Sequence, residues 1–391
     1  MDTGEYYEKK ILTQHTLFKK KRPLLEHLDI ELTERCNNNC IHCYINLPQR
    51  DPDAIHRELT TNEWKDILRQ AADIGVLAVR FTGGEPLLRK DFSELYFYAR
   101  RLGMRVLLFT NGRGITPELA SLLSRIPPLE KIEVTVYGMR AETYEAVSRV
   151  PGSFNEFWQG VQCLLKAEVP FIVKGAFLPQ NTIDQERFEE WAKTIPWMER
   201  SPSYSRYFDL RGRRDSPQKN ERISRLRANP QEKLAVFSRD EAGYRREMQT
   251  FCSRFLGPSG PLLFSCGAGE HPSIDAYGII QPCVLLRTPE LCKDLRKHSL
   301  REVLTVFFPR IKKMQTENPD YLNRCARCFI RGLCEQCPAK SWSEHGTLDT
   351  PVEYLCEVAH AQARYLGLIE PEESAWDVRN GNERIRKFTQ S

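Results

Sequence analysis

Between residues 27 and 210 the chain alternates short apolar runs with longer amphipathic segments. The short runs have the length and composition of β-strands and occupy residues 27–33, 78–84, 105–112, 131–138, 170–178 and 203–210. Helical periodicity marks segments between them, among others 61–75, 92–103, 142–147 and 154–167, and several end at Gly or lie beside Pro. Strand–helix units in series predict an α/β fold with a parallel sheet, either an open doubly wound sheet or a barrel.

Short polar or glycine-containing motifs follow the first four predicted strands. In chain order they are the cysteine loop Cys36, Cys40 and Cys43; the turn Gly83, Gly84, Glu85 and Pro86; the turn Thr110, Asn111 and Gly112; and the pair Tyr137 and Gly138. Because the carboxyl ends of parallel strands share one face of the fold, we expect these four motifs to form one site.

The cysteine loop has the spacing Cys-x3-Cys-x2-Cys. Three thiolates on one loop can bind three irons of a four-iron cluster and leave the fourth iron open to a substrate or cofactor. The alternative is a structural zinc site, which normally takes a fourth protein ligand. The spacing and the position after a strand favour the iron–sulfur interpretation.

Composition narrows the class of protein. The chain has 391 residues, 41% hydrophobic and 28% charged residues and a net charge of +5, values typical of a globular protein without a dedicated nucleic-acid surface. We see neither a bilayer-spanning apolar run nor a signal peptide at the start of the sequence, so we expect a cytoplasmic protein with no membrane partner. Of the 13 cysteines, nine lie between residues 252 and 356, where a reducing compartment favours metal binding over disulfides.

The cysteine loop and the glycine-rich turn together resemble the radical S-adenosylmethionine (radical SAM) superfamily. This resemblance covers roughly residues 27–210 and implies a partial (β/α)6 barrel of the TIM type. It implies that Cys36, Cys40 and Cys43 bind a [4Fe-4S] cluster whose open iron chelates SAM, and that the cluster cleaves SAM to a 5′-deoxyadenosyl radical. The glycine-rich turn, Gly83 to Pro86, would contact the SAM amino group.

The cysteines after residue 251 are similar to the SPASM extension of radical SAM enzymes, a small domain with a β-hairpin and short helices that binds two auxiliary [4Fe-4S] clusters. That scheme assigns Cys266, Cys283 and Cys337 to the first cluster. The second would be held by Cys325, Cys328, Cys334 and Cys356. The gap between Cys334 and Cys337 is one residue shorter than usual, and Cys252 is our candidate for the eighth ligand. A pair of zinc ribbons is the alternative, and Cys163 and Cys292 are interpreted as bystanders.

These observations divide the chain into an N-terminal extension (1–26), a radical SAM partial barrel (27–210), a basic helical linker (211–251), a SPASM-like domain (252–368) and a polar tail (369–391). The predicted hairpin occupies residues 273–285, with its turn at Tyr277 and Gly278. Further candidates for SAM binding are Thr110, Asn111, Tyr137 and Arg211. For Arg211, binding an acidic peptide and lying at a solvated surface are alternatives to SAM binding. For Tyr137, the alternative is packing in the core.

Residues 134–154 resemble the body of radical SAM/SPASM peptide maturases, which install cross-links or thioethers or epimerise residues in ribosomally made precursors. We therefore predict a peptide-modifying enzyme, with an electron donor such as flavodoxin or ferredoxin. The first 26 residues look too short for a leader-recognition domain, so a separate leader-binding protein is a further expected partner. The alternatives are a sulfatase (formylglycine) maturase, a tetrapyrrole side-chain-modifying enzyme, and a non-catalytic iron–sulfur electron carrier.

Overall fold

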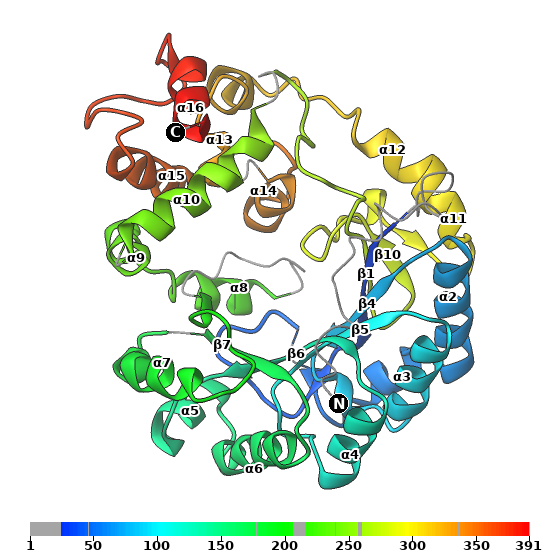
Figure 1. The fold of residues 1–391 in the computed structure, drawn as a ribbon. Coiled ribbons are helices and arrows are strands. Elements are labelled where there is room, and N and C mark those ends of the chain that lie inside the picture. The colour runs from blue at the N-terminus through cyan, green and yellow to red at the C-terminus, as the bar shows by residue number, and fades with distance from the viewer. Residues whose placement is uncertain are drawn as a thin grey trace.

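A parallel sheet forms the core of the first half of the chain (Figure 1). The computed structural model describes residues 25–45, 47–176, 178–205, 216–238, 240–256, 260–334 and 337–390. Neighbouring strands of the sheet run parallel in the order β1 (His27–Thr33), β4 (Ala78–Gly83), β5 (Arg105–Thr110), β6 (Leu129–Val136), β7 (Phe171–Ala176) and β8 (Ser203–Ser205). The predicted α/β class is confirmed. The sixth predicted strand extends to residue 210, and its second half lies outside the described residues.

Helices connect successive strands. They are α1 (Pro52–Arg57), α2 (Thr61–Asp73), α3 (Phe92–Arg101), α4 (Pro117–Arg125), α5 (Ala141–Ser148), α6 (Ser153–Lys166) and α7 (Gln185–Lys193). Helix α2 shows how the sequence specifies such an element. Thr60 and Glu63 form a reciprocal capping box at its start, and Trp64, Ile67, Leu68 and Ala71 recur at helical spacing on its buried face.

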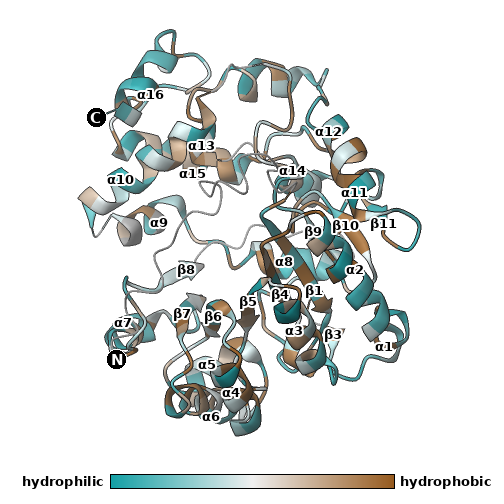
Figure 2. Cartoon of the chain, turned by 45° about the vertical axis from the view of Figure 1, so that its right-hand side comes forward, coloured by the Kyte–Doolittle hydropathy of each residue, from teal (hydrophilic) through white to brown (hydrophobic). Residues whose placement is uncertain are grey.

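The strands separate apolar from polar residues by their alternation. In β1 the side chains of Leu28, Ile30 and Leu32 belong to the hydrophobic core, whereas Asp29 and Glu31 point to the other face. Figure 2 shows the apolar colouring concentrated on these strands. The core therefore lies between the sheet and its helices, and the opposite face carries charge.

The predicted hairpin forms and joins this same sheet. Strand β9 (Ser273–Ile274) pairs antiparallel with β10 (Ile279–Gln281), and β9 also pairs parallel with β1. With β11 (Lys293–Asp294) the sheet reaches nine strands in the order β11-β10-β9-β1-β4-β5-β6-β7-β8. A separate ladder joins β2 (Arg35–Cys36) to β3 (Leu47–Pro48). The cysteine-rich region is thus attached to the barrel through main-chain hydrogen bonds, which the sequence did not predict.

Most regular elements in the described part of the remaining chain are helices. They are α8 (Pro217–Ser224), α9 (Pro230–Phe237), α10 (Glu241–Cys252), α11 (Leu300–Glu302), α12 (Phe308–Ile311), α13 (Arg331–Cys334), α14 (Pro338–His345), α15 (Glu353–Tyr365) and α16 (Gly381–Gln390). The prediction of a polar tail over residues 369–391 missed a helix. This helix, α16, contacts α10 and buries Ile385 and Phe388. Their spacing of three residues places both on one face of that helix. No helix in the described part of the chain has the length and apolarity needed to cross a bilayer.

Candidate active site

A cavity of about 250 Å³ lies at the carboxyl ends of the parallel strands. It brings together residues of all four predicted motifs: Cys36, Cys40, Cys43, Gly83, Gly84, Thr110, Asn111 and Tyr137. Glu85 and Pro86 are absent from this lining, and Arg211 lies outside the described residues. The expectation that the four strand-end motifs meet at one place agrees with this geometry.

The cysteine loop is fixed by its backbone. The amide of Asn39 donates to the carbonyl of Ser148 at 2.9 Å, and the amide of Ile41 donates to the carbonyl of Val147 at 3.1 Å. Both acceptors belong to the last turn of α5, whose carbonyls have no partner within the helix. The helix end thereby holds the loop in place.

Two nitrogen donors are directed at the sulfur of Cys36. The Asn38 amide lies 3.4 Å from Cys36 Sγ, and Asn111 Nδ2 lies 3.8 Å from it. Burial raises the pKa of the Cys36 and Cys40 thiols well above the usual range, so in the absence of a metal both thiols are neutral. Iron would take these sulfurs as thiolates, and N–H donors stabilise cluster sulfur. The three thiols on one loop therefore fit an iron–sulfur cluster. Among the described residues, no group of three or more His, Cys, Asp or Glu side chains forms a site for a single metal ion.

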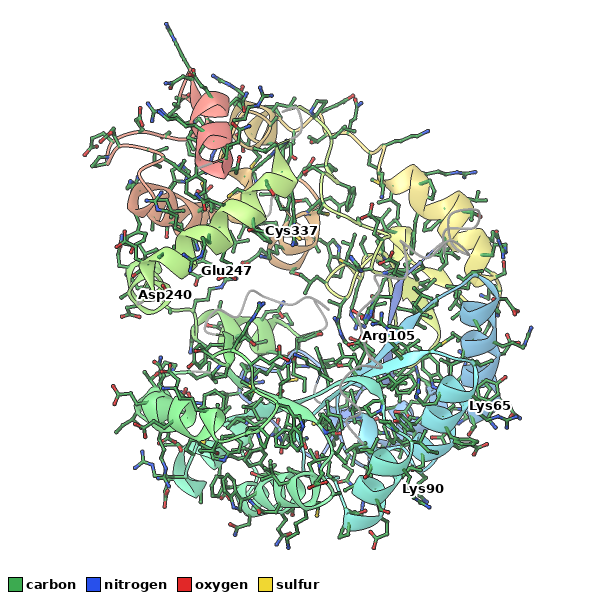
Figure 3. The ribbon with its side chains drawn as sticks, in the orientation of Figure 1. Lys65, Lys90, Arg105, Asp240, Glu247 and Cys337 are labelled. Carbon is green, nitrogen blue, oxygen red and sulfur yellow. The ribbon has the colours of Figure 1, made fainter. Side chains whose placement is uncertain are left out.

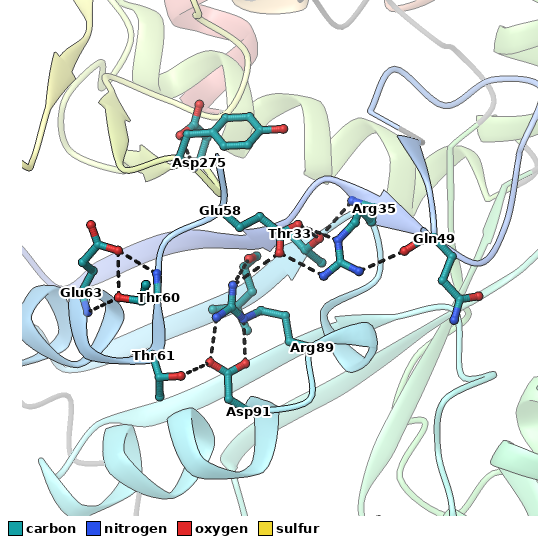
Figure 4. Close-up of polar contacts among 12 residues, drawn as sticks. Thr33, Arg35, Gln49, Glu58, Thr60, Thr61, Glu63, Arg89, Asp91 and Asp275 are labelled. Carbon is teal, nitrogen blue, oxygen red and sulfur yellow. Dashed lines mark hydrogen bonds and ion pairs between the residues drawn. The ribbon is translucent and has the colours of Figure 1, made fainter. Parts of the chain in front are cut away.

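An ion-pair network supports the chain immediately before Cys36 (Figure 4). The Glu58 carboxylate accepts two hydrogen bonds from Arg35, from Nε at 2.8 Å and from Nη2 at 2.9 Å, and a short one from the hydroxyl of Thr33. Arg89 Nη1 lies 3.6 Å from Glu58 and its Nη2 lies 2.7 Å from Asp91. The segment that leads into the cysteine loop is thus tied to the helices beside β1.

The paired glycines allow β4 to end against this same segment. A Cβ on Gly83 would lie 2.2 Å from the carbonyl oxygen of Thr33, and one on Gly84 would lie 2.3 Å from that of Arg35. Gly83 also has φ of +128°, a conformation that L side chains rarely adopt. Glycine is therefore required at both positions mainly because the two backbones approach too closely for a Cβ atom.

Glu85 turns away from the cavity and holds the next strand. Its carboxylate accepts hydrogen bonds from the hydroxyl of Thr110 at 2.8 Å, from the amide of Asn111 at 2.8 Å and from the amide of Leu87 at 3.1 Å. Burial raises its pKa to about 7. Of the two acceptors predicted for an ammonium group, this geometry favours the carbonyls of the glycine turn over the Glu85 side chain.

Tyr137 lies against the cysteine loop. Its ring centroid is 5.7 Å from that of His42 and 5.4 Å from that of Tyr144. Burial raises the pKa of its hydroxyl well above the usual range, so the hydroxyl stays protonated. Tyr137 therefore both lines the cavity and packs in the core, and the two predicted roles coincide.

Charged side chains from the strand interiors form the rest of the wall. Arg80 Nη1 donates to Asp29 at 2.8 Å, and Lys174 pairs with Glu133. Both cations lie over the ring of Phe109, at 4.8 and 3.8 Å from its centroid. We did not predict these residues. The available signal was the alternation of charge with apolar residues inside β1, β4 and β7.

Glu31 completes this wall and connects it to the cysteine-rich region. Its carboxylate pairs with Arg287, which also lies 3.8 Å from Glu34 and from Asp275. Glu31 is 1% exposed, and its second oxygen has no hydrogen-bond partner among the described residues. The same is true of the buried nitrogen Nε of Arg80.

The cysteines of the C-terminal region form two groups. Five cysteines line one cavity of about 70 Å³: the predicted second set, Cys325, Cys328, Cys334 and Cys356, and also Cys337, which was predicted for the first set. Cys266, Cys283 and Cys337 are close enough to influence one another's ionisation, because burial and then the neighbouring thiols raise the pKa of Cys337 to about 12. Figure 3 labels Cys337, the residue directly before α14.

Cys252 does not lie where it was predicted. It packs beside Gly332 and Cys334, so it belongs to the second group. Cys292, interpreted as a bystander, lies near Cys283 of the first group, whose charge adds to the effects of burial and Asp275 on its pKa. The helix α10, which ends at Cys252, packs on α13, the helix that ends at Cys334.

Comparison with known proteins identifies the class to which this site belongs. Residues 30–195 match the family model of the radical SAM superfamily. Residues 30–195 therefore form a radical SAM domain.

Among curated relatives, the AdoMet-dependent heme synthase of Methanosarcina barkeri is 28% identical over 338 residues, which span 81% of this chain and 92% of that protein. The mycofactocin maturase MftC of Mycolicibacterium smegmatis is 35% identical over 155 residues, 40% of this chain and 38% of the relative. The solved structure "Native anSMEcpe with bound AdoMet" superposes with a TM-score of 0.59 at 14% identity and covers 93% of this chain and 99% of the other. This likeness concerns the fold.

Proposed function

We propose that this protein is a radical SAM enzyme that removes a hydrogen atom from a peptide substrate, as in the maturation of ribosomally made precursor peptides. Cys36, Cys40 and Cys43 would hold the cluster, and Gly83, Gly84, Thr110, Asn111 and Tyr137 would surround SAM. When bound, the cluster and SAM supply the 5′-deoxyadenosyl radical. The observation that carries the proposal is that these residues line one cavity whose wall also includes the charged side chains of Asp29, Glu31, Arg80 and Lys174.

The chemistry of that wall supports a peptide. The cations Arg80 and Lys174 already have carboxylate partners, so their charges are balanced inside the protein. Among the described residues of the wall, the buried acceptor Glu31 Oε1 and the buried donors Arg80 Nε and Asn38 Nδ2 have no hydrogen-bond partner. A buried polar atom gains most from a ligand that completes its hydrogen bonds. A secondary amide offers one donor for Glu31 and one acceptor for Arg80 or Asn38, and a peptide carries several such groups.

Two relatives add support from sequence. MftC matches 40% of the chain, and the PqqA peptide cyclase of Streptomyces rochei is 46% identical over 98 residues, 25% of this chain. Both names describe proteins that act in peptide modification or maturation. Their matches cover about a quarter of the cyclase and 38% of the maturase, so the likeness concerns only part of each enzyme.

A second candidate is modification of a tetrapyrrole side chain, favoured by the heme synthase relative, of which 92% is covered. Tetrapyrrole side chains carry several carboxylates, and binding them requires cations with unbalanced charge. The described cations of the cavity wall are paired, which favours the peptide. Arg211 and its basic neighbours lie outside the described residues, and their predicted role in binding an anion remains a prediction.

The test uses the anaerobically reconstituted full chain with SAM and dithionite. We expect 5′-deoxyadenosine from the wild type and at least a hundredfold less from Cys40→Ala. A peptide encoded beside the gene should stimulate its formation, whereas Fe-coproporphyrin III should not. No 5′-deoxyadenosine from a fully loaded sample would refute the enzyme, and stimulation by the porphyrin alone would transfer the assignment to the second candidate.

We further propose two auxiliary clusters in the cysteine groups of the C-terminal region. The donor sets support this, because one cavity is lined by Cys325, Cys328, Cys334 and Cys356. Iron content is the direct measurement: three clusters require about twelve irons per chain, and a zinc-bearing C-terminal region would give about four.

A further inference from the structure

Cys356 differs from the other cysteines of its cavity in its access to the surface. With Cys325, Cys328 and Cys334 it lines the enclosed cavity of about 70 Å³. It also lines an open pocket of about 400 Å³ on its other side, whereas those three cysteines do not. Cys356 therefore belongs, with Arg324, His360 and Trp376, to the wall between the proposed cluster and the open pocket.

Two nitrogen groups approach the sulfur of Cys356, and both belong to residues that line the cysteine cavity as well as the open pocket. Arg324 Nη2 lies 3.7 Å from Cys356 Sγ, and His360 Nδ1 lies 3.5 Å from it. The Ala375 amide donates to His360 Nε2 at 3.2 Å, so Nε2 accepts and Nδ1 carries the ring proton. That proton is shared between the Cys356 carbonyl, at 2.8 Å, and the sulfur. Both nitrogen groups are thus donors toward Cys356.

The surroundings hold both donors in place. Arg324 makes two hydrogen bonds to Glu353, at 2.6 and 2.9 Å, and its guanidinium lies 4.8 Å from the ring centroid of Trp376. The His360 ring packs against the same Trp376 at 5.2 Å. A rigid donor loses little entropy when it forms a hydrogen bond. The arrangement is therefore suited to a permanent contact with the sulfur.

We propose that Arg324 and His360 raise the reduction potential of the cluster held by Cys325, Cys328, Cys334 and Cys356. This inference rests on the second auxiliary cluster of the proposed function. Reduction adds one electron from an external reductant to the cluster and breaks no bond. N–H donors to a ligand sulfur stabilise the more negative, reduced form. Both are positioning residues, since neither is a ligand.

The open pocket supplies a matched control. Arg364 lines the same pocket and has the same charge, but its Nε donates to the carbonyl of Pro371 at 3.1 Å. Arg364→Met therefore removes a positive charge from the pocket without removing a hydrogen bond to sulfur. Arg324→Met removes both. The difference between the two variants isolates the N–H to sulfur contact from the charge of the pocket.

The experiment is an EPR-monitored redox titration of the reconstituted full chain with dithionite as reductant. Cys36, Cys40 and Cys43 are changed to Ala, so that the SAM-binding cluster gives no signal. A hydrogen bond to a charged group contributes about 1.5–3 kcal/mol, so Arg324→Met should lower the reduced-to-oxidised ratio at a fixed potential by at least about tenfold, equivalent to ~59 mV. His360→Gln should shift the potential in the same direction, Arg324→Lys should restore part of it, and Arg364→Met should change the ratio less than about threefold.

Unchanged potentials in Arg324→Met and His360→Gln would overturn the inference while leaving the cluster intact. Failure of the cluster itself has a different signature. Cys325→Ser should lower the iron content by about four per chain. If it does not, the second auxiliary cluster is absent, and both that part of the proposed function and this inference are wrong.

Discussion

Arg35, the residue directly before Cys36, donates two hydrogen bonds to the Glu58 carboxylate. They measure 2.8 Å from Nε to Oε1 and 2.9 Å from Nη2 to Oε2. Both side chains are largely buried, with 12% and 6% of their surface exposed. The pair therefore connects the entry of the cysteine loop to the loop after α1 (Figure 4). We infer that this ion pair holds the cysteine loop in position without bound iron.

Glu58→Gln should destabilise the protein and loosen the cysteine loop. Loss of one partner from a buried pair leaves the other charge uncompensated and costs about 3–5 kcal/mol. We expect a decrease of that size in the free energy of unfolding, measured by urea denaturation, and a lower iron occupancy of the loop. Glu94→Gln is the control, because Glu94 also pairs with a cation, Lys65, but is 57% exposed. It should cost less than about 1 kcal/mol, and equal effects of the two variants would contradict the interpretation.

Glu85 predicts a pH dependence of stability. Burial raises its pKa to about 7 in the folded protein, above the usual value near 4.5. Between these values the folded state holds a proton that the unfolded state has lost, so the free energy of unfolding falls as the pH rises from about 4.5 to 7. The fall attributable to this group is up to about 3 kcal/mol. Glu85→Gln keeps one acceptor oxygen, for Thr110 and Leu87, and loses the acceptor for the Asn111 amide, so it should lower the stability overall. It cannot titrate and should flatten the profile over this interval; an unchanged slope would contradict the assignment.

The sequence predicted the face of the site well, because strand alternation and glycine-rich turns are local signals. Cys36, Gly83, Thr110 and Tyr137 meet at one cavity, as their positions after successive strands indicate. The radical SAM resemblance drawn from these motifs is confirmed by the family model. The local pattern was sufficient to predict that these motifs meet, because parallel strands with short connections can be ordered in few ways.

The sequence did not predict which distant segments pair with one another. The contact between β9 and β1 joins residues more than 240 positions apart, and nothing in either segment specifies its partner. The same holds for Arg287 and Glu31, which meet only because the hairpin joins the sheet. The position of Cys252 in the sequence did not indicate which cysteines lie near it. Its neighbours are determined by the packing of α10 on α13, and spacing does not encode that contact.

The glycine turn gives a prediction about backbone approach. In Gly84→Ala the new Cβ would lie 2.3 Å from the Arg35 carbonyl oxygen and 2.7 Å from that of Glu34, so the cysteine segment must shift. We expect a loss of about 2 kcal/mol or more in the free energy of unfolding and weaker SAM binding. Gly103→Ala is the control, because its φ of +84° is strained but its Cβ would meet nothing within 4 Å. It should cost about 1 kcal/mol and leave SAM binding unchanged.

The two cysteines outside the predicted groups can be distinguished by their effect on iron. Cys292 lies near Cys283, whereas Cys252 lies beside Cys334, so only Cys292 is placed to act on the first group. We expect Cys292→Ser to change the EPR spectrum of the first auxiliary cluster, because a buried thiol near its ligands is replaced by a hydroxyl. Cys252→Ser should leave that spectrum unchanged and reduce stability slightly, since Cys252 packs in a hydrophobic cluster with Phe329 and Cys328. The opposite pattern, with the first cluster altered by Cys252→Ser alone, would restore Cys252 as the eighth ligand.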